Sequence, residues 1–77
     1  MKQFFERLRS YPELKAGVVN LKSGTAFRGV VWKKKGGWLV LRGCEILAER
    51  GQPVQTRRVD GEVIVRMEDV DFVQVLS

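Results

Sequence analysis

The sequence predicts a mostly β domain: a small, strongly bent, five-stranded antiparallel open barrel preceded by a short α-helix. Three observations support this class. The chain has 77 residues, of which 44% are hydrophobic, so residues 1–77 are expected to form one domain with a thin core. From residue 16 to residue 77 the apolar residues recur with a period of two, which is typical of strands. Glycines interrupt these strands, as a short sheet that closes on itself requires.

The first residues of the chain predict the helix. Phe4, Phe5 and Leu8 recur at helical spacing with charged residues between them, which favours an amphipathic helix over residues 2–10. Pro12 disfavours a helical conformation in the residue before it, so the helix is expected to end nearby. Because a helix of two turns is not stable alone in water, its apolar face is expected to cover an open end of the barrel.

The five strands are expected to follow in chain order. "AGVVNL" places Val19 and Leu21 on one face, and "AFRGVVW" places Phe27 and Val31 on one face. "WLVL" resumes the pattern after three lysines and two glycines. "EVIVR" and "VDFVQVL" give the last two strands.

Several turn and bend signals connect these strands. Gly29 lies within a strand, where glycine is unfavourable unless the chain bends sharply or passes close to another backbone. Gly43 is expected to bend the third strand in the same way. Residues 49–61 are polar and predict a long loop. At its end Asp60 and Gly61, between "RRV" and "EVIV", predict a hairpin turn.

The net charge of +5 is unevenly distributed along the chain. Residues 1–59 carry a net charge of +9, and residues 60–77 carry −4. A basic body of this kind can attract a polyanion, and the acidic end can meet the basic surface of a neighbouring copy. Ordinary solvated charge on a small domain is the alternative interpretation.

The residue types that are missing argue against several classes of function. There is no histidine, and Cys44 is the single cysteine, so an internal disulfide and a site with several thiolate ligands are excluded. The commonest general base and metal ligand is also missing. We therefore expect no enzyme, catalytic residue, metal, cofactor or small-molecule substrate, and we expect Cys44 to be a small buried residue. No apolar run spans a membrane and no signal-peptide core is present, which favours a cytoplasmic protein without membrane contact.

The stretch "VVNLKSGTAFRGVV" resembles the first half of the Sm/LSm signature. The matching positions are Leu21, Gly24, Phe27, Gly29 and Val31. The order of a short helix, three bent strands, a variable loop and two short strands also agrees with that family. The resemblance implies a small barrel that forms rings, usually of six or seven subunits, and binds uridine-rich RNA around a central pore.

The resemblance also implies where neighbouring subunits would meet. In Sm-like rings the fourth strand of one subunit pairs with the fifth strand of the next, which here are "EVIVR" and "VDFVQVL". An unpaired apolar edge is a liability in a monomer, and ring closure removes it. The expected subunit interface consists of Val63, Ile64, Val65, Phe72, Val73 and Val75.

The base-reading residues of the family have no match in this sequence. The Asp of its first motif falls on Lys34 or Lys35, and the Asn falls on Trp38 or Leu39. In the family, the Asn reads a uracil edge and the Asp orients the loop. Their replacement here is therefore expected to remove the recognition of uracil rather than to weaken it. Arg66 stands for the Arg of the second motif, but Met67 replaces the Gly that follows it.

The basic turn is nevertheless the best candidate for contact with nucleic acid. Three lysines between Trp32 and Trp38 combine phosphate neutralisation with rings on which any base can stack. A solvated hairpin tip is the alternative interpretation. The expected nucleic-acid-binding residues are Lys33, Lys34, Lys35, Trp38 and Arg66.

Two further charged groups are weaker candidates. Arg57 and Arg58 are a second possible phosphate contact, but adjacent strand residues point to opposite faces. Glu68, Asp69 and Asp71 are a candidate metal or acid/base cluster, but in the absence of histidine they are expected to form an acidic turn that meets the basic surface of another subunit.

The sequence as a whole favours a non-enzymatic, ring-forming binding or scaffold protein that contacts RNA or single-stranded DNA through the basic loop. The alternative is a phage or other structural protein that uses the same barrel only for protein contacts.

Overall fold

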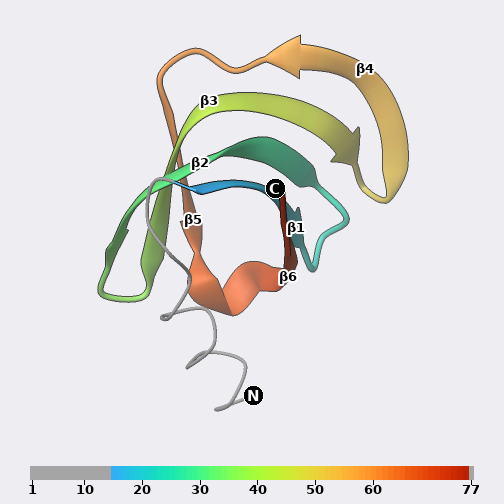
Figure 1. The fold of residues 1–77 in the computed structure, drawn as a ribbon. Helices are drawn as coiled ribbons and strands as arrows, with labels where there is room; N and C mark the ends of the chain where they lie inside the picture. The colour runs from blue at the N-terminus through green and yellow to red at the C-terminus, as the bar shows by residue number, and fades with distance from the viewer. Residues whose placement is uncertain (1–14, 77) are drawn as a thin grey trace.

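The computed structural model describes residues 15–76, so the predicted helix over residues 2–10 lies outside the described residues. The described chain consists of six strands and one short 3-10 helix (Figure 1). Their bounds are β1 (Lys15–Leu21), β2 (Ala26–Lys35), β3 (Trp38–Glu49), β4 (Gln52–Arg58), β5 (Glu62–Arg66), η1 (Met67–Asp69) and β6 (Val70–Val75).

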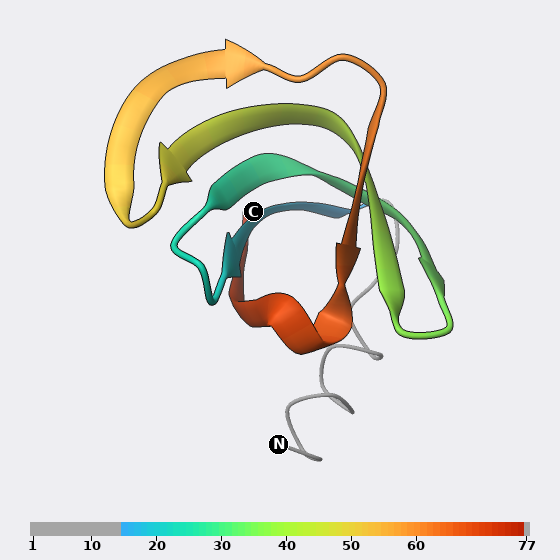
Figure 2. The ribbon, with the colours of Figure 1, turned by 180° about the vertical axis from the view of Figure 1, so that it is seen from behind.

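The strands form one antiparallel sheet in the order β4-β3-β2-β1-β6, and β5 also pairs with β3. The two partners share one edge of β3: β5 lies opposite residues 38–42, and β4 lies opposite residues 45–49. The sheet curls strongly, and β5, η1 and β6 bring the last strand round beneath the first three (Figures 1 and 2). The predicted class of strongly bent antiparallel β domain is confirmed.

The hairpin after β3 differs from the prediction in its turn and in the number of strands. The chain reverses at Arg50 and Gly51, whose φ angles of 51° and 78° are the two positive values that a tight two-residue hairpin turn needs. Residues 52–58 are a strand instead of a loop. The expected hairpin turn at Asp60 and Gly61 is wrong, because β4 and β5 pair with β3 and not with each other. Most β4 residues are exposed, so no alternation of apolar residues marks this strand.

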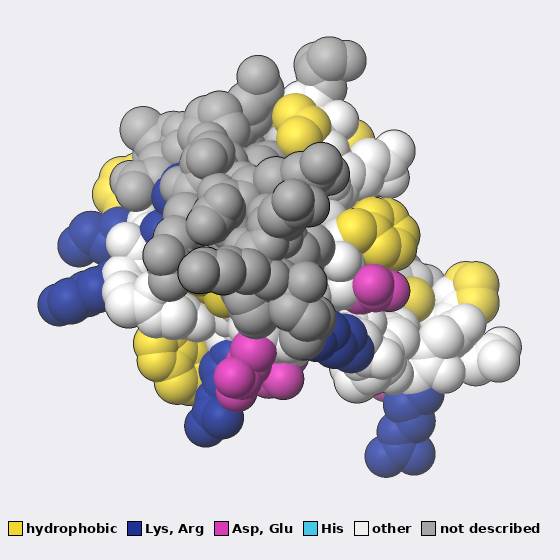
Figure 3. Space-filling view, turned by 90° about the horizontal axis from the view of Figure 1, so that it is seen from below, with side chains coloured by type: hydrophobic (Ala, Val, Ile, Leu, Met, Phe, Trp, Pro, Cys, Tyr) yellow, Lys and Arg dark blue, Asp and Glu magenta, His cyan; other side chains and the backbone are white. Residues whose placement is uncertain are grey.

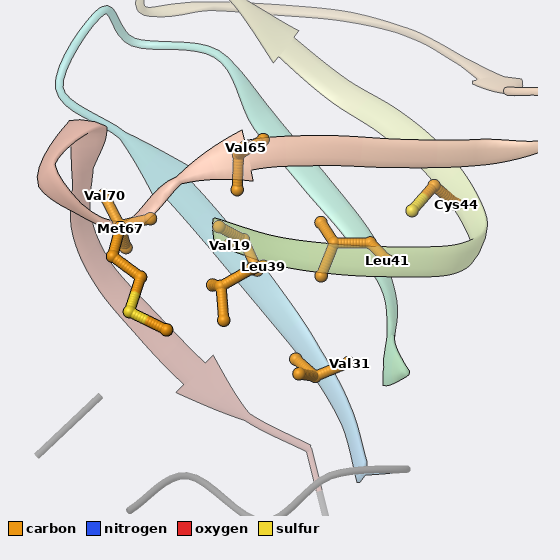
Figure 4. Close-up of a cluster of buried hydrophobic side chains, with 8 residues drawn as sticks. All are labelled: Val19, Val31, Leu39, Leu41, Cys44, Val65, Met67 and Val70. Atoms are coloured by element: carbon orange, nitrogen blue, oxygen red, sulfur yellow. The ribbon is translucent and has the colours of Figure 1, made fainter. Parts of the chain in front are cut away.

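The core lies inside the curl of the sheet, where side chains from every strand except β4 converge (Figure 4). Leu39, Cys44 and Val70 are fully buried. The buried cluster consists of Val19, Val31, Leu39, Leu41, Cys44, Val65, Met67 and Val70. Cys44 is buried as expected, and desolvation raises the pKa of its thiol.

Two glycines allow segments of the barrel to approach each other closely. A Cβ atom on Gly29 would lie 2.7 Å from Sγ of Cys44 and 3.0 Å from the carbonyl oxygen of Arg42, which confirms the predicted close approach to another backbone. A Cβ atom on Gly24 would overlap the backbone of Gly51, whose amide donates a 3.0 Å hydrogen bond to the carbonyl oxygen of Gly24. The β1–β2 turn is therefore held against the β3–β4 turn.

Candidate nucleic-acid interface

The basic turn lies at one end of a three-stranded region formed by β2, β3 and β5. Cross-strand partners in an antiparallel sheet point to the same face. Leu39 pairs with Val65 and Leu41 pairs with Val63, and these side chains face the core. The residues that alternate with them on β3, which are Trp38, Val40 and Arg42, therefore point to the outside of the barrel.

A β-bulge in β2 decides which lysines share this outer face. The register shifts between Val31 and Lys33, so Trp32 is an extra residue without a partner of its own in the β2–β3 register. Beyond the bulge, Lys33 pairs with Val40 and Lys35 pairs with Trp38. Both lysines consequently lie on the outer face.

Lys34 is separated from the other two lysines. It pairs with Leu39, on the core side of the sheet, and it is half-buried. Three consecutive lysines on a strand cannot all face one ligand, because successive side chains alternate between the two faces. The structure thus places Lys33 and Lys35 with Trp38 and Arg66, and it places Lys34 on the opposite face.

Trp38 and Arg66 lie side by side next to the β2–β3 turn. They are cross-strand partners, and the guanidinium carbon of Arg66 is 5.3 Å from the centre of the Trp38 ring. Trp38 is 43% exposed. The amide of Met67 donates a 2.7 Å hydrogen bond to the carbonyl oxygen of Gly37, which ties the start of η1 to the turn. The chain therefore brings together two predicted site residues that are 28 positions apart in the numbering.

A second tryptophan–arginine pair lies on the same outer face. The guanidinium carbon of Arg42 is 3.9 Å from the centre of the Trp32 ring. Nε of Arg42 donates a 2.6 Å hydrogen bond to Oε2 of Glu62, its cross-strand partner. Sequence patterns did not identify this pair, because it depends on the bulge at Trp32.

Together these outward-pointing side chains form a mixed aromatic and basic surface, which we call the aromatic face. Viewed from below, basic and hydrophobic side chains lie next to one another at the left edge, on the side where the β2–β3 turn lies in Figure 1 (Figure 3). The aromatic face consists of Trp32, Lys33, Lys35, Trp38, Arg42 and Arg66.

The other end of β3 carries arginines in a different setting. Nη2 of Arg28 donates to Oε1 of Glu45 at 2.8 Å, and Nη2 of Arg57 donates to Oε1 of Glu49 at 2.8 Å. We call this region the ion-pair end. It contains Arg57, one of the two arginines that the sequence suggests as a further phosphate contact. Glu49 competes with phosphate for Arg57, as Glu62 and Glu68 do for the arginines of the aromatic face, but no ring of the described residues lies against Arg57.

The predicted subunit-interface residues fall into two groups. Val63, Val65 and Val73 point into the core or pack against it. Ile64, Phe72 and Val75 are 57%, 52% and 50% exposed. Within residues 15–76, β5 and β6 each pair with another strand along one side only. Contact between copies through these strands would use their backbone edges and the three exposed side chains.

The acidic residues near the C-terminus do not form a metal site within the described residues. Within residues 15–76 no group of three or more acidic or cysteine side chains could hold a metal ion. Glu68 and Asp69 belong to η1, and Oε1 of Glu68 accepts a 3.3 Å hydrogen bond from Nη1 of Arg66. The backbone carbonyl of Asp69 accepts a hydrogen bond from the amide of Lys22. No helix in the described part of the chain is long and apolar enough to cross a membrane.

Solved structures share this arrangement over most of their length. A heptameric archaeal Sm protein is 20% identical, with a TM-score of 0.70 over 94% of this chain and 98% of that one. An Sm protein heptamer from P. aerophilum is also 20% identical, with a TM-score of 0.70 over 95% and 92% of the two chains. An Sm protein of Pyrococcus abyssii in complex with a uridine heptamer is 22% identical, with a TM-score of 0.66 over 92% and 96%. No family model and no curated protein matches the sequence.

These likenesses define the class of the protein by its fold. The chain is a small β-barrel protein with the Sm fold, so the resemblance first indicated by Leu21, Gly24 and Gly29 is confirmed at the level of the fold.

Proposed function

We propose that this protein is a non-enzymatic, ring-forming binding protein that holds single-stranded nucleic acid on the aromatic face. The observation that carries this proposal is the outer row in which Lys35, Trp38 and Arg66 are successive cross-strand partners. It presents an exposed ring between two cations. Such a row suits a strand whose phosphates are neutralised while its bases stack, without reading their edges.

The proposed contact is indifferent to base identity because of what surrounds the ring. Lysine and arginine attract any phosphate backbone, and every base has a face that can stack on tryptophan. The residues that face outward next to the row, Val40 and Ile64, have apolar side chains that cannot hydrogen-bond to a base edge. RNA and single-stranded DNA should therefore bind with comparable affinity.

The first experiment measures binding of labelled uridine-rich RNA, adenine-rich RNA and single-stranded DNA as a function of salt concentration. We expect all three to bind at low salt. The variant K33S/K35S should bind much more weakly, and the slope of log K against log salt should fall by about 0.7 for each lysine that contacts a phosphate. No binding of any of the three oligomers at low salt would end the proposal.

A matched control separates a site from general charge. The variant K22S/R58S also removes two exposed cations, but from the β1–β2 turn and from β4, outside the aromatic face. It should keep most of the affinity, since it leaves the row of Lys35, Trp38 and Arg66 intact. Equal losses in the two double variants would show that net charge, rather than this face, governs binding.

Assembly into a ring is the second part of the proposal. The unpaired edge of β5 and the unpaired edge of β6 in the described chain each carry exposed apolar side chains, Ile64 on one and Phe72 and Val75 on the other. Heterologous contacts between two such edges close into a ring when the rotation allows it. Two Sm proteins of similar fold are heptamers, which supports a ring without fixing the subunit number here.

Light scattering on a chromatographed sample tests the assembly. We expect the mass of a ring of about six or seven chains, and I64K and F72K should each shift the sample toward smaller species. A monomer at high protein concentration would contradict the ring. The exposed edges also favour a second function, that of a structural protein that uses the barrel only for protein contacts, and a ring that binds no nucleic acid would select it.

A further inference from the structure

The aromatic face contains a second feature that the row of Lys35, Trp38 and Arg66 does not use. Arg42 lies on the ring of Trp32, and Glu62 accepts a hydrogen bond from its Nε atom. The two contacts restrain the guanidinium in different ways: the ring fixes the plane of the guanidinium, and the carboxylate fixes its rotation within that plane. Because the bond to Glu62 uses Nε, both Nη atoms keep donors for another partner.

A guanidinium held in this way has the properties of a stacking platform. Its delocalised plane can stack on a nucleobase, while the donors at its rim can reach a phosphate or a base edge. The side chain of Arg42 is 48% exposed, so part of it remains accessible on the barrel surface. A lysine at this place would supply the charge but not the plane.

The guanidinium of Arg42 lies within reach of a nucleic-acid strand bound at Trp38. Trp38 and Arg42 are four residues apart on β3 and point to the same side, which corresponds to about 13 Å along the strand. That distance is about four nucleotide steps of roughly 3.4 Å each. Val40, Ile64 and Lys33 lie between the two positions on the same face, so the path between them is apolar and basic.

We propose that Arg42, stacked on Trp32 and oriented by Glu62, forms a second base-stacking position for the same single strand that Trp38 and Arg66 hold. The bound strand then runs over the outer surface of β2, β3 and β5 away from the β2–β3 turn. This inference rests on the proposed function, since a second position has meaning only if the first one binds nucleic acid. Its chemical class of ligand is a single-stranded oligonucleotide longer than a dinucleotide.

The two tryptophans provide a direct readout, because they are the only two in the chain. W38F leaves Trp32 as the single indole and keeps an aromatic ring at the first position. W32F leaves Trp38 alone in the same way. Intrinsic fluorescence of each variant then reports which position a ligand reaches.

The experiment titrates both variants with a uridine dinucleotide and with a uridine oligomer of about ten nucleotides. We expect the longer oligomer to quench both Trp38 in W32F and Trp32 in W38F. The dinucleotide, which cannot bridge the two positions, should leave Trp32 unquenched at concentrations at which it quenches Trp38. Quenching of Trp38 with no response of Trp32 to the longer oligomer would overturn the second position and leave the proposed function standing.

A charge-conserving substitution tests the role of the guanidinium plane. R42K should weaken binding of the longer oligomer by about 5-fold to about 150-fold, the range of one lost base stack, and should weaken dinucleotide binding much less. R57K is the matched control, because Arg57 is also an exposed arginine bonded to a glutamate but lies over no aromatic ring in the described part of the chain. Equal affinities of R42K and the unsubstituted protein for the longer oligomer would overturn the inference, and absence of any binding to the unsubstituted protein would instead reject the proposed function itself.

Discussion

The two ends of β3 differ in what their arginines contact. On the aromatic face, Arg42 and Arg66 lie over the rings of Trp32 and Trp38. These two arginines also bond to glutamates, Glu62 and Glu68. At the ion-pair end, Arg28 and Arg57 are bonded to glutamates but lie over no aromatic ring of the described residues. A carboxylate partner is therefore common to both ends, and the tryptophan ring that holds the guanidinium by a cation–π contact is found only on the aromatic face. The partners of the cations, more than their number, therefore distinguish a candidate interface from a solvated surface.

The largest expected effect concerns the core beneath the two ends. Leu39, under the aromatic face, is fully buried, while Ile46, under the ion-pair end, is 8% exposed and lies outside the main cluster. L39A should lower the free energy of unfolding by about 2–5 kcal/mol. I46A should cost less, because the cavity it leaves opens toward solvent. Urea denaturation of both variants measures the difference.

A larger loss in I46A than in L39A would contradict this ranking. It would mean that the barrel depends more on the β3–β4 end than the position of the buried cluster indicates. If L39A does not fold, L39V provides a smaller cavity for the same comparison.

The next effect concerns the exposed ring itself. W38A should weaken binding of a uridine oligomer by about 5-fold to 150-fold, which corresponds to about 1–3 kcal/mol for one lost base stack. W38F should recover much of the affinity, since phenylalanine retains a stacking surface. Fluorescence anisotropy of a labelled oligomer measures both. Equal weakening in W38A and W38F would argue against stacking at this position.

A smaller effect should follow from removing the carboxylate beside Arg42. E62Q keeps an oxygen that can accept the hydrogen bond from Nε of Arg42 but removes a negative charge from the aromatic face. We expect a two- to five-fold gain in affinity, about 0.5–1 kcal/mol, at low salt. E45Q removes the same charge at the ion-pair end, about 10 Å along β3 from Arg42, which is near the screening length at 0.1 M salt.

The difference in oligomer affinity between E62Q and E45Q is the informative quantity. A gain in affinity in E62Q that E45Q does not share supports a nucleic-acid strand that passes Arg42. The same gain in both variants would indicate that only the overall charge of the barrel is being sensed.

The smallest expected effect concerns the lysine on the core side of the sheet. K34S should change the affinity for a uridine oligomer much less than K35S, because Lys34 pairs with Leu39 while Lys35 pairs with Trp38 on the outer face. Anisotropy titrations at low salt measure both. A loss in K34S as large as that in K35S would show that the two lysines reach the ligand together despite pointing to opposite faces.

The sequence was sufficient to predict most of the fold. Gly29 indicated a close approach to a neighbouring backbone, and in the structure Arg42 and Cys44 occupy the space that a Cβ atom on Gly29 would need. Alternation of apolar residues located five of the six strands that the structure describes between residues 15 and 76. The strand that was missed, β4, has hardly any buried residue, so its place is set by backbone pairing with β3 and by the turn at Arg50 and Gly51, which single-residue patterns do not reveal.

The candidate site was predictable only in part. The lysines and Trp38 were identified from composition, and Arg66 from the resemblance to the Sm signature. Alternation along a strand separates Lys34 from its neighbours, but which of the three lysines face outward, and the pairing of Trp32 with Arg42, both depend on the bulge at Trp32. A bulge shifts every later residue of a strand to the other face, and no residue type in this stretch predicts the bulge.

The central claim is that nucleic acid binds on the aromatic face and not at the ion-pair end. Nuclear magnetic resonance of the isotope-labelled protein, titrated with a uridine oligomer at low salt, tests it most directly. The two indole N–H signals of Trp32 and Trp38 and the amide signals of residues 33–42 should shift with added oligomer, while those of residues 45–58 stay in place. Shifts confined to residues 45–58, with both indole signals unchanged, would contradict the account.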